Sequence, residues 1–173
     1  RAHAANFTDD EIREIVQNAH SRGKKVYVTV IIIPRNNDFD QIIDYAKRLD
    51  TLKIDAVIVA DLGVIKVFRE HTSLAIHVST QANITNKHTA LEFVRLGATR
   101  LVLARELNIT EIKEICDAVK GQAEIEVFVH GAMCVSFSGR CLISSYLTGR
   151  DANRGDCAQP CRWKYHLYEE NRE

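Results

Sequence analysis

Hydrophobic residues follow two alternating patterns along this chain. Short continuous apolar runs are separated by longer stretches in which apolar residues recur every three or four positions. The first pattern is typical of buried strands and the second of amphipathic helices. Helices are therefore predicted at 7–20, 39–52, 62–70, 87–96 and 110–119, and strands at 25–33, 56–60, 75–79, 100–104 and 124–130.

The first helix and strand show how the sequence marks such boundaries. Thr8 is a candidate N-cap, and Glu11 three positions later completes a capping box. Gly23 ends the helical pattern. The following run is rich in β-branched residues until Pro34 stops it, which predicts a strand buried on both faces.

Alternating strands and helices indicate an α/β fold, with a parallel sheet and helices packed outside it. A doubly wound open sheet and a (β/α) barrel of the TIM type both fit. No glycine-rich dinucleotide fingerprint follows a strand, and we favour the barrel. A closed barrel needs about 250 residues. We therefore expect an incomplete piece: residues 1–130 form part of a barrel, 131–165 a cysteine-rich segment of the same domain, and 165–168 a possible sixth strand.

Composition narrows the class of protein further. With 46% apolar and 27% charged residues, the chain has the composition of an ordinary globular domain. Its formal net charge is zero, so the overall field does not drive binding to nucleic acid or a membrane. No apolar run approaches the roughly 20 residues of a spanning helix. The N-terminal residues do not resemble a signal peptide, which predicts a cytoplasmic location.

Four cysteines lie in the segment after the last strand. Cys134, Cys141, Cys157 and Cys161 are spaced Cys-x6-Cys-x15-Cys-x3-Cys. Four thiolates can hold either a zinc ion or a [4Fe–4S] cluster. Only the second pair has the tight spacing typical of structural zinc sites, so we favour the cluster, with zinc as the alternative. Cys116 lies on the apolar side of a helix and is interpreted as a small core residue.

Polar residues at the ends of the predicted strands are the candidate catalytic groups, because barrel enzymes carry their chemistry at the carboxyl ends of the strands. Strand alternation places His77 on the same face as Ser79 and Gln81. Arg105 could bind a carboxylate or phosphate through its two-pronged guanidinium group, or form a surface ion pair with Glu106. The predicted catalytic set is His77, Gln81, Arg105, Glu126 and His130, and we expect His77, Gln81, Arg105 and His130 to converge at the mouth of the barrel.

Each of these residues also has a plainer interpretation. A single histidine on a strand is often a hydrogen-bonded core residue. Glu126 could act as a general base or merely as an ion-pair partner.

Basic and aromatic residues are interleaved within the cysteine-rich segment. The basic residues are Arg140, Arg150, Arg154, Arg162 and Lys164, and the aromatic residues are Phe137, Tyr146, Trp163 and Tyr165. Such side chains can contact RNA phosphates and stack on bases. The alternatives are a solvated loop, or arginines that offset the negative charge of a cluster.

Several stretches resemble one known family. Residues 126–144, EVFVHGAMCVSFSGRCLIS, match the signature of the collagenase-like peptidase family, the thirty-second family of unknown catalytic type. Residues 149–165, GRDANRGDCAQPCRWKY, resemble its tRNA hydroxylation branch, as do residues 77–83 and 103–106. The resemblance covers nearly the whole chain.

The resemblance implies a barrel-type catalytic domain whose cysteines bind a [4Fe–4S] cluster. It further implies oxygen-independent hydroxylation of wobble uridine in tRNA to 5-hydroxyuridine, with prephenate as the proposed oxygen donor. Sister branches act on ribosomal RNA or ubiquinone precursors, and collagen-degrading members gave the family its name. Two alternatives remain: a peptidase in which Cys134 or Cys141 is a nucleophile near His130, and a zinc-stabilised binding module without catalysis.

Overall fold

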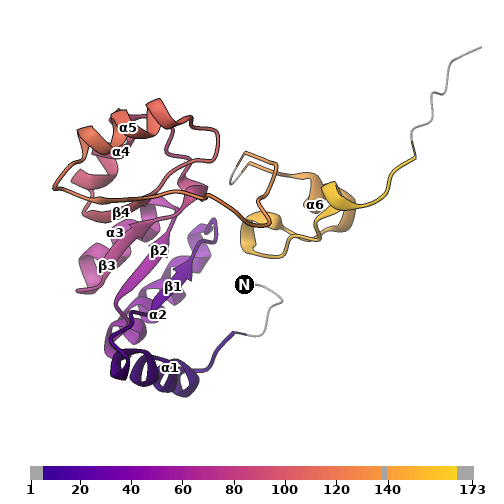
Figure 1. The fold of residues 1–173 in the computed structure, drawn as a ribbon. Coiled ribbons are helices and arrows are strands. Elements are labelled where there is room, and N and C mark those ends of the chain that lie inside the picture. Colours follow the sequence, from indigo (N-terminus) through magenta and orange to yellow (C-terminus); the bar gives the residue numbers. More distant parts are fainter. Residues whose placement is uncertain (1–5, 138–139, 167–173) are drawn as a thin grey trace, which may run out of the picture.

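A parallel five-stranded sheet forms the centre of the protein. The computed structural model describes residues 6–137 and 140–166 (Figure 1). The strands pair in sequential order, β1 to β5. Their bounds are β1 Tyr27–Val30, β2 Ala56–Val59, β3 Ala75–Val78, β4 Ala98–Val102 and β5 Glu124–Glu126.

A helix precedes the first strand, and another helix connects each successive pair. The bounds are α1 Asp9–Ser21, α2 Phe39–Thr51, α3 Leu62–His71, α4 Lys87–Arg95 and α5 Ile109–Ala118. The capping box predicted for α1 is confirmed: the Glu11 amide donates to Thr8 Oγ1 at 3.3 Å, and the Thr8 amide donates to the Glu11 carboxylate at 2.6 Å. The helices lie within two residues of the predicted ranges because caps and apolar periodicity both mark them.

The two faces of the sheet differ in chemistry. One face packs against the helices, and its valines and leucines, such as Val57, Val78 and Leu101, are fully buried. The other face carries His77 beside Arg100, and Arg100 beside Glu124, in register across β3, β4 and β5. The prediction that residues 25–33 form a strand buried on both faces is therefore wrong. Only residues 27–30 form the strand, and Thr29 is exposed, because no helix of the described residues covers this second face.

The last predicted strand is also shorter than expected. β5 ends at Glu126, and residues 127–130 continue without strand pairing. Among the described residues this strand lies at the edge of the sheet and pairs with β4 alone. Of the possible sixth strand, residues 165 and 166 are not in a strand, and residues 167–168 lie outside the described part.

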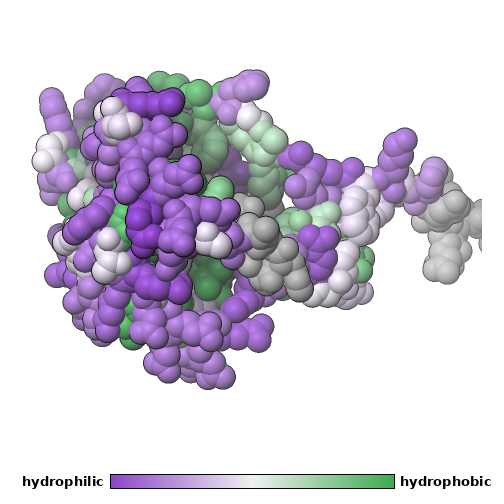
Figure 2. Space-filling model, turned by 90° about the horizontal axis from the view of Figure 1, so that it is seen from below, coloured by the Kyte–Doolittle hydropathy of each residue, from purple (hydrophilic) through white to green (hydrophobic). Residues whose placement is uncertain are grey.

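The parallel α/β architecture is confirmed by the sheet and its connecting helices. Within the described residues β1 and β5 are the two edges of the sheet and do not pair with each other. A search of the same residues finds no helix with the length and hydropathy needed to cross a bilayer. Figure 2 shows a mainly hydrophilic surface over the main body in this view.

Residues 131–137 and 140–166 form a lobe beside the sheet, which we call the cysteine lobe (Figure 1). It contains the short helix α6, Ile143–Thr148, close to the turn predicted at 142–147. Two single-turn 3-10 helices follow, η3 Ala152–Arg154 and η4 Pro160–Arg162. Gly139 of the family motif lies outside the described residues.

Candidate metal centre and carboxyl-end pocket

An ion pair anchors the cysteine lobe to the sheet. Both terminal nitrogens of Arg154 contact the Asp38 carboxylate, at 2.8 and 3.1 Å. Asp38 precedes α2, and the hydrogen bonds from Arg154 lower its pKa from 3.8 to about 2. Beside this pair, the Ile33 amide donates to the Asn153 carbonyl at 3.0 Å. Residues just after β1 are thus joined to residues just before Cys157.

Arg105 makes a second contact between the sheet and the lobe. It follows β4, and its Nη2 donates to the Ser136 carbonyl at 3.0 Å. The sequence analysis assigned Arg105 to a substrate anion or to an ion pair with Glu106. This hydrogen bond places Arg105 against the lobe between Cys134 and Cys141, and anion binding by Arg105 stays a prediction.

Hydrogen bonds inside the lobe connect the regions that flank the four cysteines. Ser144, fully buried, accepts a hydrogen bond from the Ala158 amide at 3.0 Å. This joins α6, just after Cys141, to the residue after Cys157. The Arg162 guanidinium donates to the Met133 carbonyl at 3.3 Å, which joins the neighbours of Cys161 and Cys134.

The four cysteines are all at least partly exposed, and none is paired with another. Cys134, Cys157 and Cys161 are exposed, Cys141 is half-buried, and none forms a disulfide. Cys157 Sγ accepts a hydrogen bond from the Gln159 amide at 3.3 Å. Four free thiols in one lobe fit the donor chemistry of a [4Fe–4S] cluster. Across residues 6–137 and 140–166, however, no three His, Cys, Asp or Glu side chains are arranged to hold a metal ion, so the ligand set stays a prediction.

The arginines of the lobe serve the protein's own structure. Arg150 pairs with the buried carboxylate of Asp156 at 3.0 Å, Arg154 with Asp38, and Arg162 with a carbonyl. The Tyr165 hydroxyl likewise donates to the Pro160 carbonyl at 2.8 Å. Contact of these arginines with RNA phosphates stays a prediction, and the structure shows that Arg150, Arg154 and Arg162 also bind groups of the protein itself.

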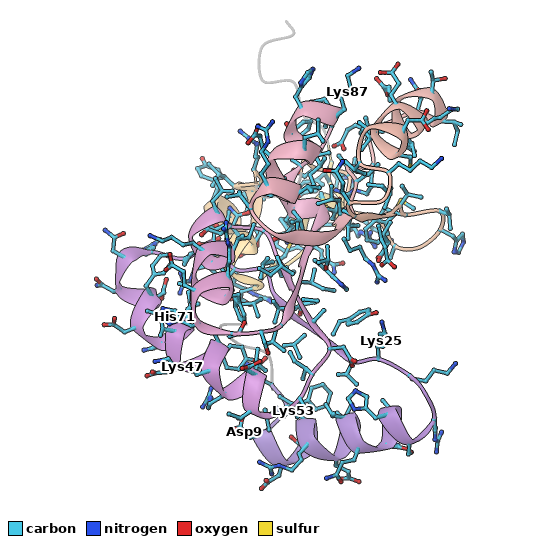
Figure 3. All side chains as sticks on the ribbon, turned by 90° about the vertical axis from the view of Figure 1, so that its left-hand side faces the viewer. Asp9, Lys25, Lys47, Lys53, His71 and Lys87 are labelled. Carbon is cyan, nitrogen blue, oxygen red and sulfur yellow. The ribbon has the colours of Figure 1, made fainter. Side chains whose placement is uncertain are left out.

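His77 lies in a hollow at the amino ends of the strands. The hollow has a volume of about 560 Å³ and is lined by residues at the start of each strand. His77 is 6% exposed, and its ring meets the Tyr27 ring edge-on at 4.7 Å between centroids. Burial, together with the nearby positive charge of Arg100, lowers the pKa of His77. Figure 3 shows Lys25, which lines the same hollow, on the side away from the helices that carry Lys47 and His71.

Glu126 belongs to the same face of the sheet. Its carboxylate lies 3.5 Å from Arg100 Nη1, and the Glu124 carboxylate accepts from Arg100 Nε at 2.8 Å. Of the two roles left open for Glu126, ion-pair partner is the one that the structure shows. His130 follows β5 and is exposed.

The predicted convergence of His77 with Gln81 is wrong. β3 ends at Val78, and Ser79 caps the 3-10 turn η2, Thr80–Ala82. The two-residue alternation consequently stops before Gln81. His77 faces the amino-end hollow, whereas Gln81 lies at the opposite end of the strand.

A second pocket lies at the carboxyl ends of β1, β2 and β3. It has a volume of about 350 Å³ and is lined by Ile33, Ala60, Asp61, Leu62, Gln81, Ala82, Asn83, Phe93 and Arg140. We call it the carboxyl-end pocket. Arg140 comes from the cysteine lobe, next to Cys141, so the lobe forms part of the pocket wall. Gln81 was in the predicted catalytic set, whereas Asp61 and Asn83, which also follow strands, and Arg140, predicted as an RNA contact, were not.

Comparison with known proteins identifies relatives along the whole chain. The model of peptidase family U32 matches residues 1–173. An uncharacterized protease of Methanocaldococcus jannaschii is 45% identical over 176 residues, covering 100% of this chain and 43% of that protein. A tRNA hydroxylation protein P1 of Bacillus subtilis is 42% identical over 170 residues, covering 98% of this chain and 40% of that protein. A 23S rRNA 5-hydroxycytidine C2501 synthase of Escherichia coli is 39% identical over 165 residues, covering 95% of this chain and 25% of that protein.

These coverages mean that the chain spans less than half the length of each of these relatives. A solved structure of a U32 peptidase resembles the fold with a TM-score of 0.58 and 24% identity, over 68% of this chain and 51% of that one. This likeness supports the α/β fold.

Proposed function

The chain belongs to peptidase family U32, and we propose that it is part of an RNA-modifying hydroxylase. One observation carries the proposal: the lobe with the four cysteines contributes Arg140 to the same pocket as Gln81 and Asn83, at the carboxyl ends of the strands. Enzymes built on parallel (β/α) units place their chemistry at this end. The names of the Bacillus and Escherichia relatives point to RNA hydroxylation as the reaction class.

The five strands are proposed to be one part of a (β/α) barrel. Their sequential order supports this, since a doubly wound sheet reverses its order at a switch point. The open edges at β1 and β5, and the polar face that no described helix covers, are where further strands of a longer protein would pair and pack.

Cys134, Cys141, Cys157 and Cys161 are the proposed ligands of a [4Fe–4S] cluster. A cluster held there would supply one-electron redox chemistry next to the carboxyl-end pocket. The chain's own residues position the lobe: Arg154 through Asp38, and Arg105 through the Ser136 carbonyl.

The proposed reaction is hydroxylation of the wobble uridine of tRNA to 5-hydroxyuridine. Anticodon bases are unpaired, so presenting one of them to a pocket costs less than extruding a base from a duplex. The family resemblance makes prephenate the oxygen donor to test first. Among the predicted catalytic residues, Gln81 lines the pocket, Arg105 positions the lobe, and His130 remains a candidate proton-transfer group. His77 lines the amino-end hollow, and Glu126, the last residue of β5, is an ion-pair partner of Arg100.

Peptidase activity is the second candidate, favoured by the name of the Methanocaldococcus relative. It would need a nucleophile with a base within hydrogen-bonding reach. In the described residues no hydrogen bond joins His130 to Cys134 or Cys141, while the ring of His130 and the thiol of Cys134 are exposed. Ligation of a cluster by these cysteines would also remove them as nucleophiles.

The experiment that tests the proposal is mass spectrometry of tRNA nucleosides from cells that lack the full-length protein and any paralogue. We expect 5-hydroxyuridine to be lost, to return with the wild-type gene, and to stay absent with a Cys157→Ala gene. Unchanged 5-hydroxyuridine would refute the tRNA assignment. Cleavage of collagen or casein by the purified protein, together with unchanged 5-hydroxyuridine in cells that lack it, would favour the peptidase instead.

A further inference from the structure

The carboxyl-end pocket contains a hydrogen-bond acceptor without a partner. Asn83 lines the pocket, and its side-chain oxygen Oδ1 is buried and receives no hydrogen bond within the described part of the chain. Leaving a polar atom buried and unpaired is costly, and such atoms are nearly always satisfied in proteins. An unpaired acceptor in the wall of a pocket therefore calls for a donor that arrives with a ligand.

The backbone holds this acceptor in a fixed place. Asn83 has φ +58°, in the left-handed region that few residues other than glycine adopt. Its amide donates to the Thr80 carbonyl at 3.0 Å, and the next residue, Ile84, accepts from the Ala104 amide at 3.1 Å. Thr80 is itself joined to the Leu103 carbonyl. Strained residues that the surroundings fix so firmly are concentrated at binding sites.

Charge and size narrow the class of ligand. The ionisable residues of the pocket wall are one acid, Asp61, and one base, Arg140, which together leave it without net charge. Asp61 Oδ1 is already engaged, because it caps α3 by accepting from the Val64 amide at 3.0 Å. A neutral wall with an amide acceptor suits an uncharged polar group better than a compact dianion. The volume of about 350 Å³ is at the lower end of the range for small-molecule sites.

We propose that the carboxyl-end pocket receives one unstacked uracil base, whose N3–H donates to Asn83 Oδ1. This assignment rests on the proposed function and names the residue that recognises its substrate. Gln81, from the same turn, carries the amide donor that a flanking uracil carbonyl needs. Arg140, exposed at the rim, contacts the phosphate of the same nucleotide. Cytosine carries an acceptor at N3 instead of a donor. It would therefore place two acceptors, its N3 and Asn83 Oδ1, opposite each other without a hydrogen bond.

The test uses the full-length protein and an anticodon stem–loop RNA with uridine or 3-methyluridine at the target position. Methylation removes the N3–H donor. In the wild type we expect methylation to weaken binding of the RNA by about tenfold, the effect of losing one well-placed hydrogen bond. Asn83→Gly should weaken binding of the uridine RNA by a similar factor. In that variant methylation should have no further effect, since the acceptor is already absent.

Control variants separate recognition from folding. Glycine suits the positive φ at Asn83, so Asn83→Gly should keep the fold, to be checked by its melting temperature. Asn86→Gly, at the exposed cap of α4, is the matched control and should retain the full preference for uridine. Arg140→Gln should weaken the binding of both RNAs by the same factor. It should also reduce the slope of log affinity against log salt concentration by the amount expected for about one phosphate contact.

Two results would overturn the assignment. One is equal affinity of the wild type for uridine and 3-methyluridine RNAs; the other is an Asn83→Gly variant that still discriminates between them. If the protein produces 5-hydroxyuridine in cells but gives either result, only the base pocket is refuted. If 5-hydroxyuridine is unchanged in cells without the protein, the proposed function fails, and this assignment fails with it.

Discussion

Replacing Ser144 with alanine should loosen the part of the cysteine lobe that carries Cys157. Ser144 is fully buried in α6, and its hydroxyl accepts the hydrogen bond of the Ala158 amide at 3.0 Å. Alanine leaves that buried amide without a partner, at a cost of about 1–3 kcal/mol. Local opening of the segment should therefore become about 5- to 150-fold more frequent.

Amide hydrogen exchange of the full-length protein measures this opening directly. We expect faster exchange at Ala158 and its neighbours in Ser144→Ala, with exchange in the sheet unchanged. Ser145→Ala is the matched control, because the Ser145 hydroxyl is exposed and makes only a 3.4 Å contact with the Arg150 carbonyl. Equal exchange at Ala158 in both variants and the wild type would show that Ser144 does not hold the lobe together.

Three further predictions follow from other contacts. Hydrogen bonds from Arg154, with a smaller effect of the Arg35 amide, lower the pKa of Asp38 from 3.8 to about 2. The ion pair should therefore contribute to lobe anchoring above about pH 3.8 and be lost as pH falls through about 2. The Asp38 carboxyl signal in NMR should titrate near 2 in the wild type and at a higher pH in Arg154→Leu. Phe68→Ala, in the fully buried core, should lower the free energy of unfolding by about 3–5 kcal/mol in denaturant titrations, whereas exposed Lys66→Ala should change it by less than about 0.5 kcal/mol. Alanine at Cys134, Cys141, Cys157 or Cys161 should severely lower the iron content measured after anaerobic purification, and Cys116→Ala should not; full iron in two of the four variants would contradict the ligand set.

The elements of the main body could be predicted from local signals in the sequence. Thr8 with Glu11 fixed the start of α1, and apolar runs located all five strands. Burial on the second face of the sheet could not be predicted correctly, because it depends on what packs there. The β-branched run at 25–33 resembles a doubly buried strand, yet the face that includes Thr29 is not covered by any described helix.

The site was harder to predict because its contacts join distant parts of the chain. Arg154 and Asp38 are separated by 116 positions, and no local pattern marks their pairing. The basic residues of the lobe therefore resembled an RNA-binding surface, although three arginines bind the protein itself. His77 was misplaced for a different reason: strand alternation was extended past Val78, where a 3-10 turn redirects the chain towards the carboxyl-end pocket.

Arg140 connects the cysteine lobe with the carboxyl-end pocket. It stands next to Cys141 in the sequence and lines the pocket that contains Asn83. A redox centre on the lobe would then lie beside the bound base. The contacts of Arg105 with Ser136 and of Arg154 with Asp38 would hold the lobe in a fixed position relative to the pocket. This arrangement makes occupancy of the lobe by a cluster the central claim.

Iron and acid-labile sulfide in the anaerobically purified full-length protein test that claim most directly. The account predicts about four iron and four sulfide per chain, the composition of one [4Fe–4S] cluster. A colourless protein with one zinc per chain and no iron would contradict it.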